Sequence, residues 1–367
     1  TRPVWCKMSL MRKESFFRMS RTDAVALLER ARVVHVATTN ASGDPIFRAL
    51  DVAVMGDRLV FHGAPAGEKM DALGRAAVVS AEEVVASIPS YFIDPARACP
   101  ATTLYRSVQV HGMLDEITDN AEKARALEAL LHKNQPEGGY TPIRHDDPMY
   151  AKTVAGLLVV AVSLERIDGK AKLAQNRTPE EQRRIASALW NRGFHDSARS
   201  SPGDAEAAFA VVHASPHTPL PDFLRAPHGL RLDLGAGKSD AEACADLLEG
   251  EYWNDRFTRD EIVRSHLASS AWIVARDKDR VVASARAISD GTKYAWIYDV
   301  VVSTDWRGRS VGDAVVRLLL DHPAVRRARF VRLGTRDAMP FYEKMGFIAR
   351  DSLPPRPYAS TEMILLR

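Results

Sequence analysis

The sequence is poor in the features that define several classes of protein. Only three cysteines occur in 367 residues, and Cys6, Cys99 and Cys244 lie too far apart for a metal site or a disulfide framework. A net charge of +3 is small for this length and argues against a dedicated nucleic-acid binder. The longest apolar run, at 156–162, has the length of a strand rather than of a membrane span. We therefore expect a cytoplasmic protein with no metal site, no membrane association and no nucleic-acid partner.

The chain is longer than a single hydrophobic core usually fills, so two domains are expected. A stretch at 195–228 separates two halves that differ in their pattern of expected helices and strands. It contains five prolines, at positions 202, 216, 219, 221 and 227. We interpret it as a linker with a short helix near 205–212. The first residues, from Thr1 to Lys7, contain no apolar signal core, and 1–19 is interpreted as an extension without assigned function. The expected domains are then 20–194 and 229–367.

The N-terminal half alternates short apolar strands with turn residues. A helix is expected from Ser20, because Asp23 follows at capping-box spacing and an apolar stripe comes next. Strands are expected at 33–39, 45–55, 58–63, 77–81, 105–116 and 156–167, and further helices at 121–133 and 179–192. Many strands with few helices indicate a small, mainly-β barrel.

The C-terminal half mixes helices and strands in a different order. Strands are expected at 230–234, 271–276, 281–289, 293–302, 330–334 and 362–366. Helices are expected at 240–249, 258–268, 312–320 and 339–345. This pattern favours an α/β domain with a mixed central sheet.

A candidate phosphate site follows the predicted strand at 293–302. A short loop with arginines and a glycine leads there into an amphipathic helix, and backbone N–H groups at such a helix start attract a pyrophosphate. A plain tight turn explains such a loop equally well. The residues concerned are Arg307, Gly308, Arg309, Ser310, Val311 and Gly312.

A second motif lies downstream of this loop. The strand at 330–334 is followed by a helix that carries Phe341 and Tyr342, and the helix leaves through Gly346 and Phe347. The two motifs, in this order and spacing, resemble the Gcn5-related N-acetyltransferase (GNAT) family over about 229–367. The resemblance implies binding of acetyl-CoA and transfer of its acetyl group to a small-molecule amine, which the sequence does not identify.

The resemblance assigns roles to individual residues. Arg307 and Gly312 fit the family's pyrophosphate loop, while Ser310 stands where the family has a glycine, which implies strain if that position needs a positive φ. The strand residues Val300, Val301 and Val302 would offer backbone groups to the acyl arm of the cofactor. Tyr342 would protonate the departing CoA thiolate, or it is a packing aromatic. The candidates for the group that takes the proton of the amine are Glu251, Tyr298 and Asp299, each of which is otherwise a structural or surface residue. The asparagine common before the family's last motif helix is absent, and Arg336 and Asp337 occupy that region.

The N-terminal half contains a second constellation of small and basic residues. Arg48 lies on one predicted strand, the next strand ends in His62 and Gly63, and Lys69 opens a predicted helix. Cations, small residues and a helix start suit a phosphate monoester. With segments at 98–112 and 169–177, this arrangement resembles the flavin-binding split barrel of the pyridoxamine 5′-phosphate oxidase-like superfamily, closest to the branch of nitroimidazole-resistance proteins, over about 20–192.

This second resemblance implies an FMN site completed across a homodimer. Lys69 would hold the phosphate with His62 and Gly63 lining that end. Arg48, Leu50 and Asp51 would lie around the ring and ribityl chain, and Tyr105, Arg106 and Ser107 would approach from a second subunit. The oxidases proper have a hydroxyl residue at the place of Gly63, an arginine at that of Glu68, and a C-terminal substrate-binding tail that is missing here. Oxidation of pyridoxamine phosphate is therefore not expected. Adjacent helical residues point about 100° apart, so Lys69 is expected to face the phosphate and Glu68 the solvent.

The leading interpretation is a bifunctional protein, in which an FMN-dependent, oxidoreductase-like barrel is fused to an acetyltransferase. Two alternatives stay open. The barrel binds or degrades haem through one of the strand histidines, His35, His62 or His111, or it senses flavin or haem and regulates the acetyltransferase.

Overall fold

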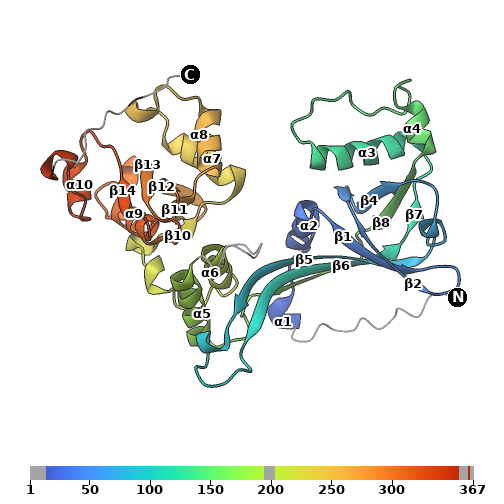
Figure 1. The fold of residues 1–367 in the computed structure, drawn as a ribbon, viewed down its shortest axis with the longest axis horizontal. Coiled ribbons are helices and arrows are strands. Elements are labelled where there is room, and N and C mark those ends of the chain that lie inside the picture. Colours follow the sequence, from blue (N-terminus) through green and yellow to red (C-terminus); the bar gives the residue numbers. More distant parts are fainter. Residues whose placement is uncertain (1–13, 194–202, 355–362, 364–367) are drawn as a thin grey trace. The chain divides into compact units, whose positions relative to one another are not determined.

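The structure, a computed structural model, describes residues 14–193, 203–354 and 363. They form two compact units, one made of 14–189 with 203–219 and the other of 190–193 with 220–354 (Figure 1). The extension at 1–13, part of the predicted linker at 194–202 and the strand predicted at 362–366 lie outside the described residues, except for Met363. No helix of the described ranges is both long enough and apolar enough to cross a membrane.

The first unit contains two antiparallel sheets. The order is β2-β1-β5-β6-β9 in one sheet and β3-β4-β8-β7 in the other. The strands are β1 Val34–Thr39, β2 Pro45–Leu50, β3 Ala53–Met55, β4 Arg58–Gly63, β5 Ala76–Ile88, β6 Thr102–Met113, β7 Asp115–Glu116, β8 Leu158–Ser163 and β9 Ile167–Lys172. The helices are α1 Glu14–Phe17, α2 Arg21–Arg30, α3 Asn120–Asn134, α4 Ala151–Gly156, α5 Pro179–Arg192, whose last residues belong to the second unit, and α6 Asp204–His213, with 3-10 turns η1 Glu68–Met70 and η2 Ser90–Phe92.

The core of this unit lies between its two sheets. Valines and leucines of both sheets meet there with Leu27 and Leu28 of helix α2, which begins at the expected cap because Ser20 accepts a hydrogen bond from the Asp23 N–H. Helix α3 packs its apolar side on the β3–β4–β8 sheet in a second cluster. The expected mainly-β architecture is confirmed.

Several predicted strands differ in extent. The strand expected at 45–55 is two strands, because the chain passes from one sheet to the other at Asp51 and the buried Val52. Strand β5 is far longer than the predicted 77–81, since it pairs with β6 from Ala76 to Ile88. Glu82 and Glu83 hide this continuation in the sequence, and Arg30 and Arg106 pair with Glu83 at 2.9 and 3.2 Å.

The second unit is built on one mixed sheet with the order β10-β11-β12-β13-β14, in which only β13 and β14 run parallel. The strands are β10 Arg231–Leu234, β11 Ala271–Asp277, β12 Arg280–Ser289, β13 Tyr294–Val302 and β14 Phe330–Arg332. The helices are α7 Gly237–Leu247, α8 Arg259–Leu267, α9 Val311–Asp321 and α10 Met339–Glu343, with 3-10 turns η3 Asp222–Leu224, η4 Pro227–Gly229, η5 Tyr252–Asn254, η6 Thr304–Trp306 and η7 Arg350–Ser352. The expected α/β class with a mixed sheet is confirmed.

Helices cover both faces of this sheet. Helices α7 and α8 bury Cys244, Leu248 and Val263 against Trp272 and Val274 of β11. Helix α9 contacts β11, β12 and β13, and its apolar side is fully buried. The two layers fix β13 and the loop after it, which carry the predicted acetyl-CoA site.

Candidate functional site

Strand β13 leaves its partner β14 after the first third of its length. The two strands pair only from Tyr294 to Trp296, whereas β12 pairs with β13 as far as Val302. Beyond Trp296, no strand of the described residues therefore pairs with the β14 side of β13. Val300 to Val302 lie in this unpaired part, so their backbone on that side has no strand partner among the described residues, as an extended acyl arm requires.

The loop after β13 forms a concave run of backbone N–H groups. Gly308 has a φ of 74°, Ser310 a φ of 58°, and helix α9 starts at the next residue. The Ser310 side chain does not cap the helix. The first N–H groups of α9 are thus free of a side-chain cap and suit a pyrophosphate. The serine in the glycine position does adopt the left-handed conformation that the sequence analysis identified as a source of strain.

Gly312 is the second residue of helix α9, directly after the loop. A Cβ atom on Gly312 would be 3.4 Å from Val302 Cγ2 and 3.5 Å from Phe341 Cζ. These are ordinary contacts, so one added methyl group fits. A larger side chain would reach toward β13 and α10, which lie on either side of the expected path of the acyl arm.

The arginines of the loop point in different directions. The Arg307 guanidinium donates to Glu251 Oε1 at 2.9 Å and to the Val302 carbonyl at 3.0 Å, so it braces the loop from within. Glu251, a predicted base, is thereby held in an ion pair. Arg309 stacks on Trp306 at 5.2 Å and pairs with no carboxylate of the described residues. Arg309 is therefore the arginine of this loop that is available to a phosphate.

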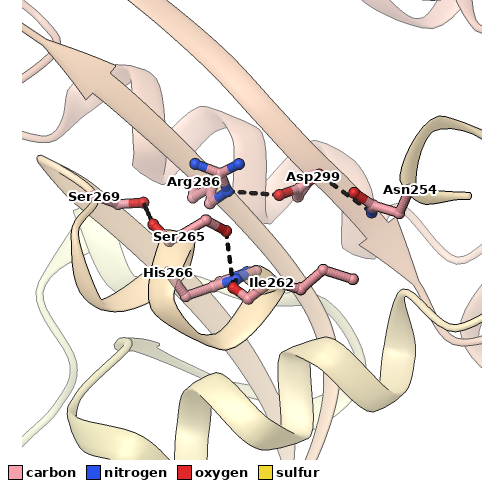
Figure 2. A network of polar contacts seen from close by, with 7 residues as sticks. All are labelled: Asn254, Ile262, Ser265, His266, Ser269, Arg286 and Asp299. Atoms are coloured by element: carbon pink, nitrogen blue, oxygen red, sulfur yellow. Dashed lines mark hydrogen bonds and ion pairs between the residues drawn. The ribbon is translucent and has the colours of Figure 1, made fainter. Parts of the chain in front are cut away.

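A buried polar network lies beside the bulge in β13, on the α8 face of the sheet (Figure 2). Asp299 is 8% exposed, has a φ of 51°, and accepts from Arg286 Nε at 2.5 Å and from Asn254 at 3.4 Å. His266 is fully buried with Nδ1 2.9 Å from the Ile262 carbonyl, and burial lowers its pKa. The ion pair with Arg286 gives Asp299 a structural role, and its predicted role as a base stays a prediction.

Tyr342 lies on the short helix α10 and is 9% exposed. Its ring packs edge-on against Phe341 at 4.9 Å and Phe347 at 5.8 Å. Burial, with a smaller contribution from Tyr252, raises the pKa of Tyr342 to about 12. The residue thus carries its proton at neutral pH, as a leaving-group acid must, and it also packs as an aromatic, so both readings of the sequence survive.

The first unit holds a cavity of about 290 Å³ between its two sheets and turn η1. This volume is near the lower end of the roughly 300–1,000 Å³ of small-ligand pockets. The lining is mostly apolar and includes five of the predicted site residues: Arg48, Leu50, His62, Gly63 and Lys69.

Lys69 and Gly63 fit each other closely. A Cβ atom on Gly63 would lie 2.8 Å from the Lys69 ammonium nitrogen. The absence of a side chain at position 63 therefore lets the Lys69 ammonium lie over the end of β4, as a cradle for an anion would require. The helix expected to open at Lys69 is only a three-residue 3-10 turn, Glu68–Met70, so no α-helix dipole supports the site.

The expected orientation of Glu68 is wrong. Glu68 lines the cavity together with Lys69 and forms an ion pair with Arg48. The physical reason is the guanidinium on β2, which attracts the carboxylate across the cavity mouth. The mouth thus holds two cations and one anion, and its net charge still favours a phosphate group.

Other predicted residues lie elsewhere. Asp51 does not line the cavity, because Asn134 of helix α3 donates to its carboxylate at 2.5 Å. Tyr105, Arg106 and Ser107 lie on β6 about eight residues before Leu114, which lines the cavity, so roughly 25–30 Å of strand separates them. They do not reach the cavity of their own chain, and their predicted approach from a second subunit stays a prediction.

The three strand histidines lie in different places, and only one of them lines the cavity. His62 lines the cavity and is exposed. His35 stacks on Phe47 and lies 3.7 Å from Glu82, and His111 lies 3.9 Å from Asp168. Among the described residues, no group of three or more histidine, cysteine or acidic side chains is arranged to hold a metal ion.

Sequence reasoning missed one exposed surface. Tyr294, Trp296 and Tyr298 alternate along β13 with buried residues and point to one face of the sheet. Their alternation with buried residues is the signal in the sequence, and the strand expected at 293–302 accounts for it without indicating a surface. Arg286, which stacks on Tyr298 at 5.0 Å, was missed because its partner Asp299 lies on another strand.

Two segments of the chain match family models. Residues 20–171 match the pyridoxamine 5′-phosphate oxidase model, and residues 240–347 match the acetyltransferase (GNAT) family model. The chain therefore contains an N-terminal pyridoxamine 5′-phosphate oxidase-like domain and a C-terminal GNAT acetyltransferase domain. Both resemblances seen in the sequence are confirmed. A search of curated proteins found no match.

Solved structures resemble each half separately. A putative 5-nitroimidazole antibiotic resistance protein from Bacteroides thetaiotaomicron is 17% identical, with 42% of this chain and 85% of that chain covered and a TM-score of 0.34. An FAD and heme binding protein from Mycobacterium smegmatis is 23% identical, with 43% and 73% covered and a TM-score of 0.36. A putative GNAT acetyltransferase from Xanthomonas campestris is 23% identical, with 36% and 96% covered and a TM-score of 0.30. At these TM-scores, the likenesses support no statement about activity.

Proposed function

We propose that the second unit is an acetyl-CoA-dependent N-acetyltransferase acting on a small-molecule amine. The observation that carries the proposal is the combination of a strand that leaves its neighbour after Trp296 with a concave, uncapped helix start at Ser310 and Val311. The first accommodates an extended acyl arm, and the second binds a pyrophosphate.

The reaction is a direct transfer. The lone pair of the amine nitrogen attacks the thioester carbonyl, the carbon–sulfur bond breaks, and the CoA thiolate leaves with the electron pair. Backbone N–H groups of β13 near Val300 would stabilise the developing oxyanion. The amine loses one proton, to Glu251 or Asp299 directly or through water, or to solvent by a relay through the Tyr298 hydroxyl, and the thiolate gains one from Tyr342. No covalent intermediate on the protein is needed.

Calorimetric titration with acetyl-CoA tests this proposal. Wild type should bind, and Gly312→Val should lose binding because the branched side chain projects between Val302 and Phe341. Gly291→Val is the matched control, since a Cβ there meets no atom within 4 Å, although its φ of 73° makes some loss of stability expected. Unchanged affinity in a folded Gly312→Val variant would refute the assignment.

We further propose that the cavity of the first unit binds FMN, which would supply hydride or electron chemistry. The apolar lining suits a flat ring, and the Lys69 ammonium over Gly63 suits the phosphate. Glu68 opposes the phosphate and is offset by Arg48. Binding would orient the ring between the sheets and shield it from water. The homodimer, the contribution of Tyr105 to Ser107, the cytoplasmic location and an oxidoreductase activity belong to this proposal.

Fluorescence quenching on titration of FMN into apoprotein tests the flavin site. Lys69→Ala should weaken binding about 10- to 100-fold, the effect of losing one charge-assisted hydrogen bond. Glu68→Gln should strengthen binding, because it removes the anion and frees Arg48. Lys152→Ala, on the exposed side of helix α4, is the control and should change nothing. If wild type shows no saturable quenching, or Lys69→Ala binds as well as wild type, the FMN proposal fails; a Soret band with added haemin would then favour the haem alternative.

A further inference from the structure

One face of β13 and β14 carries aromatic side chains that no helix of the described residues covers. Phe330 lies opposite Tyr294 in register, and Ile288 of β12 lies opposite Trp296. The exposed fractions are 45% for Tyr294, 36% for Trp296, 38% for Tyr298, 49% for Phe330 and 53% for Ile288. Adjacent exposed aromatics on a sheet usually mark a binding surface. We call these five residues the aromatic face.

The aromatic face lies on the same side of the sheet as helices α7 and α8. Trp272, which packs under α7, lies opposite Arg286, and Arg286 lies opposite Tyr298. Residues opposite each other in neighbouring strands share a face. Among the described residues, α7 and α8 thus cover this face around Trp272 and Val301 and leave the five residues of the aromatic face exposed.

Cations border the aromatic face without acidic partners. Arg332 lies opposite Trp296 in register and its guanidinium is 5.0 Å from the Tyr294 ring centroid, while Arg329 stacks on Phe330 at 5.7 Å. In the described part of the chain, no carboxylate forms an ion pair with Arg329 or Arg332. The surface therefore complements a ligand that is both aromatic and anionic.

The inner end of the aromatic face adjoins the predicted acetyl position. Trp296 and Tyr298 stack with ring centroids 6.0 Å apart, and the bulge at Asp299 and Val300 follows immediately. Two to three strand residues span roughly 7–10 Å. A ligand ring on Trp296 or Tyr298 would therefore place an amine on a short side arm at the thioester carbonyl.

We infer that the acetyl acceptor is an amine that carries an aromatic ring and a carboxylate, with its ring on Trp296 and Tyr298 and its carboxylate on Arg332. This inference rests on the proposed acetyltransferase function and names its substrate class. The amine nitrogen would form the new amide bond, and the proton and CoA would leave as described above.

Release of CoA thiol by the full-length protein, at saturating acetyl-CoA, tests the inference with three matched amines. L-tryptophan carries the ring and the carboxylate, L-alanine lacks the ring, and tryptamine lacks the carboxylate. We expect L-tryptophan to exceed each of the others in kcat/KM by about 10-fold or more, the effect of one lost stacking or charged contact.

Two variants test separately the contact with the aromatic ring and the contact with the carboxylate of the acceptor. Trp296→Ala should raise the KM for L-tryptophan about 5- to 10-fold and leave that for L-alanine unchanged. Arg332→Gln should raise the KM for L-tryptophan but not for tryptamine. Tyr91→Ala, an aromatic of the first unit that is 65% exposed, is the control and should change neither. L-alanine used as well as L-tryptophan would overturn the inference while leaving the acetyltransferase standing.

A binding experiment keeps the inference independent of turnover. N-acetyl-L-tryptophan, the product of this class, is titrated into the full-length protein with CoA present, and wild type should bind it more tightly than Trp296→Ala. The inference fails if no saturable binding appears up to about 5 mM, a concentration that would detect even a weak product complex. Absence of acetyl-CoA binding in calorimetry would instead refute the proposed function itself.

Discussion

Ser310→Gly should stabilise the second unit. Ser310 holds a φ of 58° and a ψ of 18°, which costs a residue with a Cβ about 1–2 kcal/mol relative to glycine. Glycine costs about 0.5–1 kcal/mol more entropy on folding, so the net gain is about 0.5–1 kcal/mol. The serine side chain is exposed and makes no cap hydrogen bond, and its removal sacrifices no contact seen in the structure.

Scanning calorimetry of the full chain measures this effect in the transition that acetyl-CoA shifts upward. A gain of this size raises Tm by about 1–4 °C for a unit of this length. Gly308→Ser is the reciprocal control: its φ is 74° and a Cβ there meets no atom within 4 Å, so backbone conformation alone should lower Tm. Acetyl-CoA affinity should stay equal or improve in Ser310→Gly, since the N–H is kept. A neutral result for both variants would show that the loop does not hold these dihedrals in solution, and the argument for a strained phosphate loop would fail.

Two further predictions concern catalysis and assembly. Tyr342→Phe should lower kcat more than acetyl-CoA affinity, because a leaving-group acid acts mainly in the transition state. Since the pKa of Tyr342 is about 12, wild-type kcat should not fall between pH 7 and about 10 through loss of this proton. If Tyr342→Phe has an unchanged kcat while chemistry is rate-limiting, Tyr342 is a packing residue. The full chain should be a homodimer through its N-terminal unit, and a monomeric mass by light scattering at micromolar concentration would contradict this.

The sequence predicted individual helices, strands and loops better than it predicted which residues these elements contact. The loop from Arg307 to Gly312 was recognisable because its residue types and its position before an amphipathic helix are local properties. The pairing of Glu68 with Arg48 was not, since it joins a turn to a strand 20 positions earlier, and the expected helical geometry at 68–69 was wrong. The strand expected at 156–167 is likewise divided, since β8 ends at Ser163 and β9 begins at Ile167, and the short helix α4 just before it was not predicted.

Burial of charge was the least predictable property. Asp299 lies within the strand expected at 293–302, where its carboxylate was a candidate for the group that takes the proton of the amine. In the fold it is 8% exposed, and this burial is tolerable only because Arg286 lies within 2.5 Å on the neighbouring strand. No spacing rule connects positions 286 and 299, because the hairpin between β12 and β13 and the bulge determine which residues meet.

The same arginine links the two halves of the proposed site. Arg286 donates to Asp299 and at the same time lies over the Tyr298 ring, so one side chain fixes both the bulge and the inner end of the aromatic face. The positive φ at Asp299 is of a kind that aspartate tolerates better than most residues, and the ion pair holds it there. Because the bulge sets the direction of Val300 to Val302, the place where the acyl arm would lie depends on the contact that also orients Tyr298. In the proposed site, the positions of the acceptor and of acetyl-CoA would therefore both depend on the contacts of Arg286.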